Sequence, residues 1–188
     1  MPLLPSAAPR PQTGLTLIEL LVVIAIAAIV LGIGIPSLQS SIVANRLASQ
    51  ANELHTALQF ARSEALRRNA SVSLSHRGAA GSNDWSSGWR SFVTATGEEL
   101  RIAPALVRPL GLRASRTIGD TLSFDARGRA SSAGAFVLCH DDVLVSEGAQ
   151  RSRVLVINGA GRIRTGQDAN RDGVIETDTG VVTSCAAP

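Results

Sequence analysis

The sequence predicts an α+β protein in which a long amino-terminal helical region precedes an antiparallel β-rich head. Three observations lead to this prediction. Residues 15–35 are an almost uninterrupted apolar run, and residues 37–69 place apolar side chains three or four positions apart. After residue 69, short β-like segments alternate with glycine-rich turns. A chain of 188 residues has room for one modest domain behind such a helix.

Composition excludes several classes of protein. With 45% hydrophobic and 18% charged residues, the chain is too apolar for a generally disordered protein. Its 17 glycines and two cysteines exclude collagen-like and disulfide-dense chains. All 18 basic residues are arginine, and the formal net charge is +3. A genomic composition bias explains arginine without lysine, so only the local placement of arginines can indicate a binding site.

Residues 15–36 are the predicted transmembrane segment, because about 20 apolar residues are enough to span a bilayer as a helix. Arg10 and the free amino terminus would keep the start of the chain in the cytoplasm. Glu19 is the only charged residue in the segment. Because a carboxylate inside a membrane is energetically costly, its presence suggests a functional role. An ordinary secretory signal fits less well, since the run is too long and no small-residue cleavage site follows it.

Residues 37–69 are predicted to form an amphipathic helix. Arg67 and Arg68 near its end place positive charge at the negative end of the helix dipole. The predicted apolar stripe consists of Val43, Leu47, Ala51, Leu54, Leu58, Ala61 and Ala65.

Residues 70–188 are predicted to form one antiparallel β head with a small core. The stretch Glu98–Gly119 matches no recognisable pattern and is interpreted as a connection rich in Arg and Pro. The expected strands are Ser71–Ser75, Trp89–Thr94, Thr121–Phe124, Ala135–Cys139 and Arg153–Ile157.

The amino-terminal string Gly14-Leu-Thr-Leu-Ile-Glu19, with the apolar run and Pro36 behind it, resembles type IV pilins and type II secretion pseudopilins. The resemblance implies a class III leader that a prepilin peptidase removes by cutting after Gly14. Leu15 would then be N-methylated, although the family usually has Phe at this position. Glu19 would pair with the amino terminus of a neighbouring subunit during assembly, and Pro36 falls where family members carry a helix-kinking proline.

The rest of the chain resembles the FimT/GspH family of minor pilins and secretion pseudopilins. The resemblance rests on residues 57–74, the tryptophan pair Trp85 and Trp89, and segments ending at Cys139 and Arg164. It implies a long helix packed on a head of two small antiparallel sheets. The implied division is 1–14 leader, 15–36 transmembrane and assembly helix, 37–69 periplasmic half of the helix, and 70–188 head.

The implied function is that of a minor type IV pilin of the FimT kind, with the H pseudopilin of type II secretion as the alternative. Its partners would be other pilins or pseudopilins, the prepilin peptidase, the inner membrane and DNA. It would cross the inner membrane once with a periplasmic head and then join a pilus or pseudopilus at the cell surface. An anchored enzyme is a weaker third possibility, because no catalytic set of residues stands out.

Cys139 and Cys185 are the only cysteines. A periplasmic head would lie where disulfides form and persist, so one Cys139–Cys185 bridge is expected. Two free buried thiols are the alternative.

Four arginines without an intervening acid lie at residues 151, 153, 162 and 164. If Arg153–Ile157 pairs with the segment around Arg164 as a hairpin, we expect Arg151, Arg153, Arg162 and Arg164 to form one basic patch. Such a patch would bind DNA through phosphates without reading sequence. The Gly161-Arg-x-Arg164 element resembles the DNA-binding motif of FimT-type minor pilins, which implies a role in natural transformation.

Asp168, Asn170 and Asp172 resemble the first half of a Ca²⁺ loop, but the closing glutamate is missing. We expect either a weak Ca²⁺ site or a solvated acidic loop whose charges would neutralise the arginines. We expect no other metal, no cofactor and no catalytic residues. His140 with Asp141 and Asp142 is better explained by a turn after a strand, since no second histidine or nucleophile accompanies it.

Overall fold

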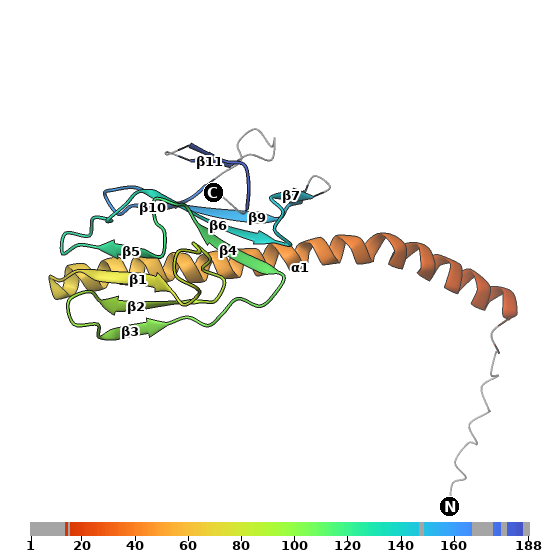
Figure 1. The fold of residues 1–188 in the computed structure, drawn as a ribbon. Coiled ribbons are helices and arrows are strands. Elements are labelled where there is room, and N and C mark those ends of the chain that lie inside the picture. Colours follow the sequence, from red (N-terminus) through yellow and green to blue (C-terminus); the bar gives the residue numbers. More distant parts are fainter. Residues whose placement is uncertain (1–13, 15, 147–148, 167–174, 178–179, 186–188) are drawn as a thin grey trace, which may run out of the picture. The chain divides into compact units, whose positions relative to one another are not determined.

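The computed structural model describes residues 14, 16–146, 149–166, 175–177 and 180–185, and the chain divides into two compact units, 1–39 and 40–188. In this part of the chain there is one long helix, α1 (Leu17–Arg68), followed by strands only (Figure 1). The strands are β1 (Val72–His76), β2 (Trp89–Val93), β3 (Glu99–Ile102), β4 (Leu110–Ala114), β5 (Thr121–Phe124), β6 (Gly134–His140), β7 (Val145–Ser146), β8 (Ala149–Gln150), β9 (Ser152–Ile157), β10 (Ile163–Thr165), β11 (Ile175–Thr177) and β12 (Gly180–Val182).

The first unit contains the start of α1. Thr16 precedes the helix, and its Oγ1 accepts a hydrogen bond from the amide of Glu19 at 3.3 Å. This is the N-cap arrangement, and Glu19 lies where negative charge favours the helix dipole. By length and hydropathy, no helix in the described part of the chain qualifies as a membrane span.

The second half of α1 ends in a helix-terminating motif. Asn69 has a positive φ of 49°, which asparagine tolerates better than most residues. The amide of Ala70 bonds to the carbonyl of Ala65 at 3.2 Å, and that of Asn69 bonds to Leu66 at 3.4 Å. These two bonds are those of a Schellman motif, so the predicted helix end at residues 67–69 is confirmed with a defined cap.

The apolar stripe of α1 lies in the main core, as predicted. Leu47, Leu54 and Leu58 are buried, while Val43 packs partly buried against the same core. The same core contains the buried aromatic side chains Trp85, Trp89, Phe124 and Phe136.

The head contains two antiparallel sheets of four strands among the described residues. Sheet A has the order β3-β2-β1-β5, and sheet B has the order β10-β9-β6-β4. The predicted fold class, a long helix packed on antiparallel sheets, is therefore confirmed (Figure 1). Two further antiparallel pairs, β7–β8 and β11–β12, form separate two-stranded hairpins.

The five predicted strands are all present, but the interpretation of Glu98–Gly119 as a connection is wrong. This stretch contains β3, which pairs with β2, and β4, which pairs with β6. β3 is a largely exposed edge strand of only four residues, so its alternation of Leu100 and Ile102 with charged residues is too short to stand out. β4 does alternate, with Leu110, Leu112 and Ala114 buried, and that period of two was overlooked.

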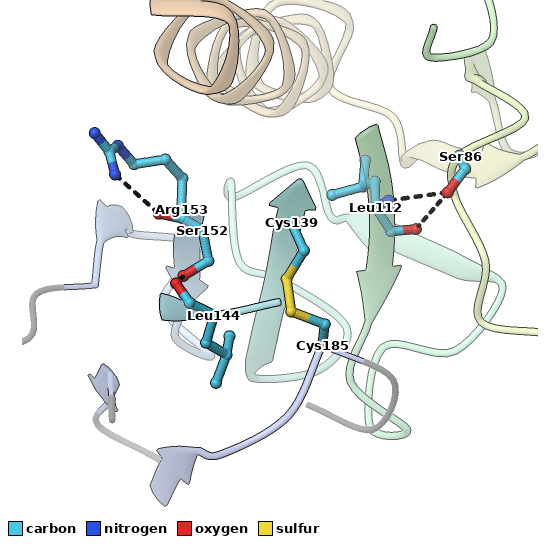
Figure 2. The surroundings of a disulfide bond; sticks show 7 residues. All are labelled: Ser86, Leu112, Cys139, Leu144, Ser152, Arg153 and Cys185. Carbon is cyan, nitrogen blue, oxygen red and sulfur yellow. Dashed lines mark hydrogen bonds between the residues drawn. A yellow bond between two sulfur atoms is a disulfide. The ribbon is translucent and has the colours of Figure 1, made fainter. Parts of the chain in front are cut away.

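Sheet B is covered on both faces. Phe136 and Leu155 face the main core beside α1, whereas Val137, Val154 and Val156 belong to a second, smaller cluster. Residues Val182 and Cys185 of the carboxyl-terminal segment complete this second cluster. Cys185 forms the predicted disulfide with Cys139 of β6, with their Cα atoms 6.2 Å apart (Figure 2).

Candidate nucleic-acid interface

The arginines of the predicted patch are carried by the β9–β10 hairpin. Ile163 pairs with Ile157, and Arg164 pairs with Val156, so the expected hairpin is confirmed. The turn between the strands is closed by Asn158, whose carbonyl accepts the amide of Gly161 at 2.8 Å. The Asn158 side chain accepts the amide of Arg162 at 2.9 Å, which fixes the backbone at the first arginine.

Strand alternation divides the four arginines between the two faces of sheet B. Arg164 lies opposite Val156 and therefore on the face away from α1. Arg153 lies opposite Leu138, whose side chain belongs to the main core on the α1 face. Successive side chains of a strand point to opposite faces, so Arg162 shares the face of Arg164, and Arg151 shares that of Arg153. The single patch expected from the sequence is therefore wrong, because the arginines form two separate pairs.

Arg151 and Arg153 on the α1 side contact their surroundings. Nη1 of Arg151 lies 3.3 Å from Nδ1 of His140 and 3.8 Å from Oδ2 of Asp141. Asp141 in turn lies 2.8 Å from His140. Arg153 donates from Nη1 to the carbonyl of Ser152 at 2.9 Å, directed away from the disulfide (Figure 2). This pair has carboxylate, imidazole and carbonyl partners.

Arg162 and Arg164 are exposed. With Val156 and Asn158 they line an open pocket of about 210 Å³ on the outer side of the hairpin. An open pocket with two guanidinium groups suits an anionic group, because each guanidinium presents a planar fork of donors.

The hairpin turn is held against a second turn by a contact between two glycines. Gly161 has a φ of +75°, and a Cβ added to it would overlap the carbonyl oxygen of Gly128, in the β5–β6 turn. Arg62 of α1 bridges the two turns, donating to the carbonyl of Gly128 at 2.9 Å and to that of Ala160 at 3.4 Å. Sequence analysis missed Arg62, because a contact across 66 residues leaves no local signal.

The remaining features predicted from the sequence are the two tryptophans and the candidate metal ligands. Trp85 and Trp89 are buried, so they are core side chains and not a surface for stacking bases. The candidate Ca²⁺ residues Asp168, Asn170 and Asp172 lie outside the described residues, as does Leu15. Among the described residues, no group of three or more His, Cys, Asp or Glu side chains is arranged to hold a metal ion.

Comparison with known proteins decides the family. A family model described as type II transport protein GspH matches residues 50–161, more than half of the chain. The chain belongs to the GspH family. A model of the prokaryotic N-terminal methylation motif also matches residues 9–35, in agreement with the motif around Gly14 and Glu19. No curated protein matches the chain.

Two solved structures place this GspH-family chain among minor pilins and pseudopilins. Both are crystal structures of the type IV minor pilin FimU of Pseudomonas aeruginosa, each 28% identical to this chain. One matches with a TM-score of 0.57 over 75% of this chain and 96% of that chain. The other matches with a TM-score of 0.54 over 74% of this chain and 99% of that chain. The pilins and pseudopilins are structural proteins and not a class of enzymes.

Proposed function

We propose that this chain is a minor type IV pilin of the FimT kind that binds DNA through phosphate contacts during natural transformation. The observation that carries the proposal is the exposed pair Arg162 and Arg164 on the outer face of the β9–β10 hairpin. The second pair, Arg151 and Arg153, faces the other side of sheet B and is engaged by His140 and by backbone. We assign the DNA contact to Arg162 and Arg164, because both side chains are exposed and line the open pocket of the hairpin.

The chemistry supports phosphate binding without sequence readout. Arginine forks match phosphate oxygens, and such contacts position a protein on DNA without distinguishing bases. Since the two tryptophans are buried, they offer no aromatic platform for single-stranded bases. Binding should therefore weaken steeply with salt, as counterion release requires.

A titration of duplex DNA with the full-length chain in nonionic detergent tests the proposal. Replacing Arg162 and Arg164 with Gln should cost roughly tenfold in affinity for each lost phosphate contact near 0.1 M salt. The matched control replaces Arg151 and Arg153 with Gln, which removes the same charge from the opposite face. Equal losses in the two double variants, or no binding by the unaltered chain, would reject the proposal.

We further propose that the amino-terminal segment is processed and inserted as in other members with this motif. Cleavage would follow Gly14, Leu15 would be N-methylated, and residues 15–36 would anchor the chain in the inner membrane. In support, the large apolar side chains from Leu17 to Leu31 are each more than half exposed, and exposed apolar surface of this extent calls for a partner. Intact-mass measurement of the chain from its native membranes should show loss of residues 1–14 and one added methyl group.

Assembly into a pilus would use Glu19 and the helix around Pro36. Glu19→Ala should leave membrane insertion intact but reduce recovery of the chain in sheared pili. Normal recovery of this variant would contradict the assembly role of Glu19. Thr16 remains in place to cap the helix, so the variant keeps the N-cap hydrogen bond acceptor.

A role as the H pseudopilin of type II secretion is the second candidate, because the matching family model carries the description GspH. Cross-linking in the native cell separates the two roles. Cross-links to pilins in sheared pili support the first, and cross-links to secretion pseudopilins support the second.

A further inference from the structure

The β5–β6 turn, which lies against the β9–β10 turn, carries two more exposed arginines. Arg127 and Arg129 flank Gly128, and both side chains are exposed. The carbonyl of Gly128 is the group that meets Gly161, the residue directly before Arg162. Since neighbouring Cα atoms are about 3.8 Å apart, the two pairs of arginines start from adjoining pieces of backbone.

Several backbone contacts hold the two turns together. The amide of Ala130 donates to the carbonyl of Gly159 at 3.2 Å, beside the contact between the two glycines. Arg62 spans the seam with one hydrogen bond to each turn. The two turns therefore present a single surface, which we call the paired-turn surface and define by Arg127, Arg129, Arg162 and Arg164.

The acid of the β5–β6 turn is Asp125, and it is occupied by backbone. Its Oδ1 accepts the amides of Arg127 and Arg129, each at 2.9 Å. The amide of Arg129 contributes most to the lowered pKa of Asp125, and the charges of both arginine side chains lower it further. Asp125 thus offsets part of the charge of Arg127 and Arg129 while it fixes the turn.

At the carboxyl-terminal end of α1, by contrast, two arginines are neutralised by ion pairs with glutamates. Arg67 and Arg68 lie 2.6 and 2.9 Å from Glu64, and Arg68 also lies 3.0 Å from Glu98. Among the described residues, no ion pair of this kind involves the side chain of Arg127, Arg129 or Arg162. Exposed positive charge from Arg127, Arg129 and Arg162 therefore gathers on the paired-turn surface, beside the exposed Arg164.

We infer that Arg127 and Arg129 form the second half of a DNA-phosphate site, continuous with Arg162 and Arg164 across the contact between Gly128 and Gly161. This inference rests on the proposed function and extends it to a turn about 35 residues earlier in the chain. Each strand of duplex DNA carries a phosphate every 3.4 Å or so along the axis, so adjoining turns can engage successive phosphates. The β5–β6 turn thereby lengthens the contact and adds no base readout.

The test is a titration of fluorescent duplex DNA with the full-length chain in nonionic detergent, at several salt concentrations. Arg127→Gln with Arg129→Gln should weaken binding roughly tenfold for each lost contact and lower the salt slope by about 0.9 for each. The matched control is Arg90→Gln with Arg101→Gln, which removes the same charge from sheet A and should leave the slope unchanged. Melting temperatures of all variants confirm that each remains folded.

The outcomes separate this inference from the proposed function. If Arg162→Gln with Arg164→Gln weakens binding while Arg127→Gln with Arg129→Gln does not, the DNA function stands and the second half-site is rejected. If the control pair weakens binding as much as Arg127 and Arg129 do, only net charge matters and the site is again rejected. If the unaltered chain binds no DNA, both the function and the extension fail.

Discussion

The two faces of sheet B are built from the same strands but are covered in different ways. The α1 face packs large side chains such as Phe136, Leu155 and Ile157 against the helix stripe. The outer face carries smaller residues, Val137, Val154 and Val156, beneath a carboxyl-terminal segment joined by the disulfide. Packing of large apolar side chains dominates the α1 face. On the outer face, the disulfide holds the carboxyl-terminal segment against the sheet.

The same division separates the arginines by their surroundings. On the α1 face Arg151 contacts His140 and Asp141, whereas on the outer face Arg162 and Arg164 are exposed. Residue type and spacing are alike in the two pairs, yet their surroundings differ because strand register assigns them to opposite faces. The net charge of the chain therefore does not indicate which arginines are exposed on the outer face.

The largest expected effect comes from comparing neighbours on β6. Phe136→Ala should cost about 3–5 kcal/mol of unfolding free energy, because its ring packs edge-on against Trp85 at 4.8 Å in the main core. Val137→Ala, one residue further and on the outer face, should cost only about 2 kcal/mol, for the smaller apolar volume lost. Denaturant unfolding of both variants measures the difference, and equal losses would contradict the contrast between the faces.

The next effect concerns the disulfide. Replacing Cys139 and Cys185 with Ala should cost roughly 4 kcal/mol, by the loop-closure entropy for a separation of 46 residues. Thermal unfolding of the variant beside the reduced unaltered chain checks this, because both lack the bridge and should melt together. A variant as stable as the oxidised chain would mean that the carboxyl-terminal segment packs on sheet B without help from the disulfide.

A smaller effect is expected at the hairpin turn. Gly161→Ala should destabilise by about 2 kcal/mol or more, since a left-handed backbone costs 1–2 kcal/mol for a residue with a Cβ and this Cβ meets the Gly128 carbonyl. Gly159→Ala is the control, because open space surrounds it, and it should stay within about 0.5 kcal/mol. Chemical denaturation of the two variants tests whether the turn is fixed by this contact.

The smallest effect is a pH dependence at the helix end. Hydrogen bonds from Arg67 and then Arg68 lower the pKa of Glu64 from 4.5 to about 2. The stability from this ionised group is present above pH 4.5 and is lost as pH falls towards 2. Melting temperatures between pH 5 and 2 should therefore fall less steeply for Glu64→Gln than for the unaltered chain, and identical slopes would contradict the ion pairs.

Much of the fold could be predicted from local patterns. The period of the α1 stripe, the helix stop at Arg67 and Arg68, and the strands of the core each follow from side chains that repeat with the geometry of one element. β3 is less evident from its sequence, because its alternation spans only four residues and only Leu100 packs partly buried against the core, while the strand pairs with β2 at the sheet edge. β4 was predictable from its alternation and was missed.

The candidate site was predicted only in part. The hairpin and its arginines were expected, but the face on which each arginine lies depends on the pairing of Arg164 with Val156. The contact between Gly128 and Gly161 and the bridge from Arg62 join three segments distant in sequence. No local pattern encodes such contacts, because each segment is an ordinary turn or helix until the others pack against it.

The sequence by itself determined the family, the helical apolar run, the β-rich head and the pairing of its only two cysteines. These are properties of residue type and short-range spacing, which act before distant segments meet. Tertiary structure decided which arginines are neutralised, which are exposed, and that the β5–β6 turn adjoins the β9–β10 turn. Register and close backbone approach decide these properties, because only a folded sheet fixes which side chains share a face.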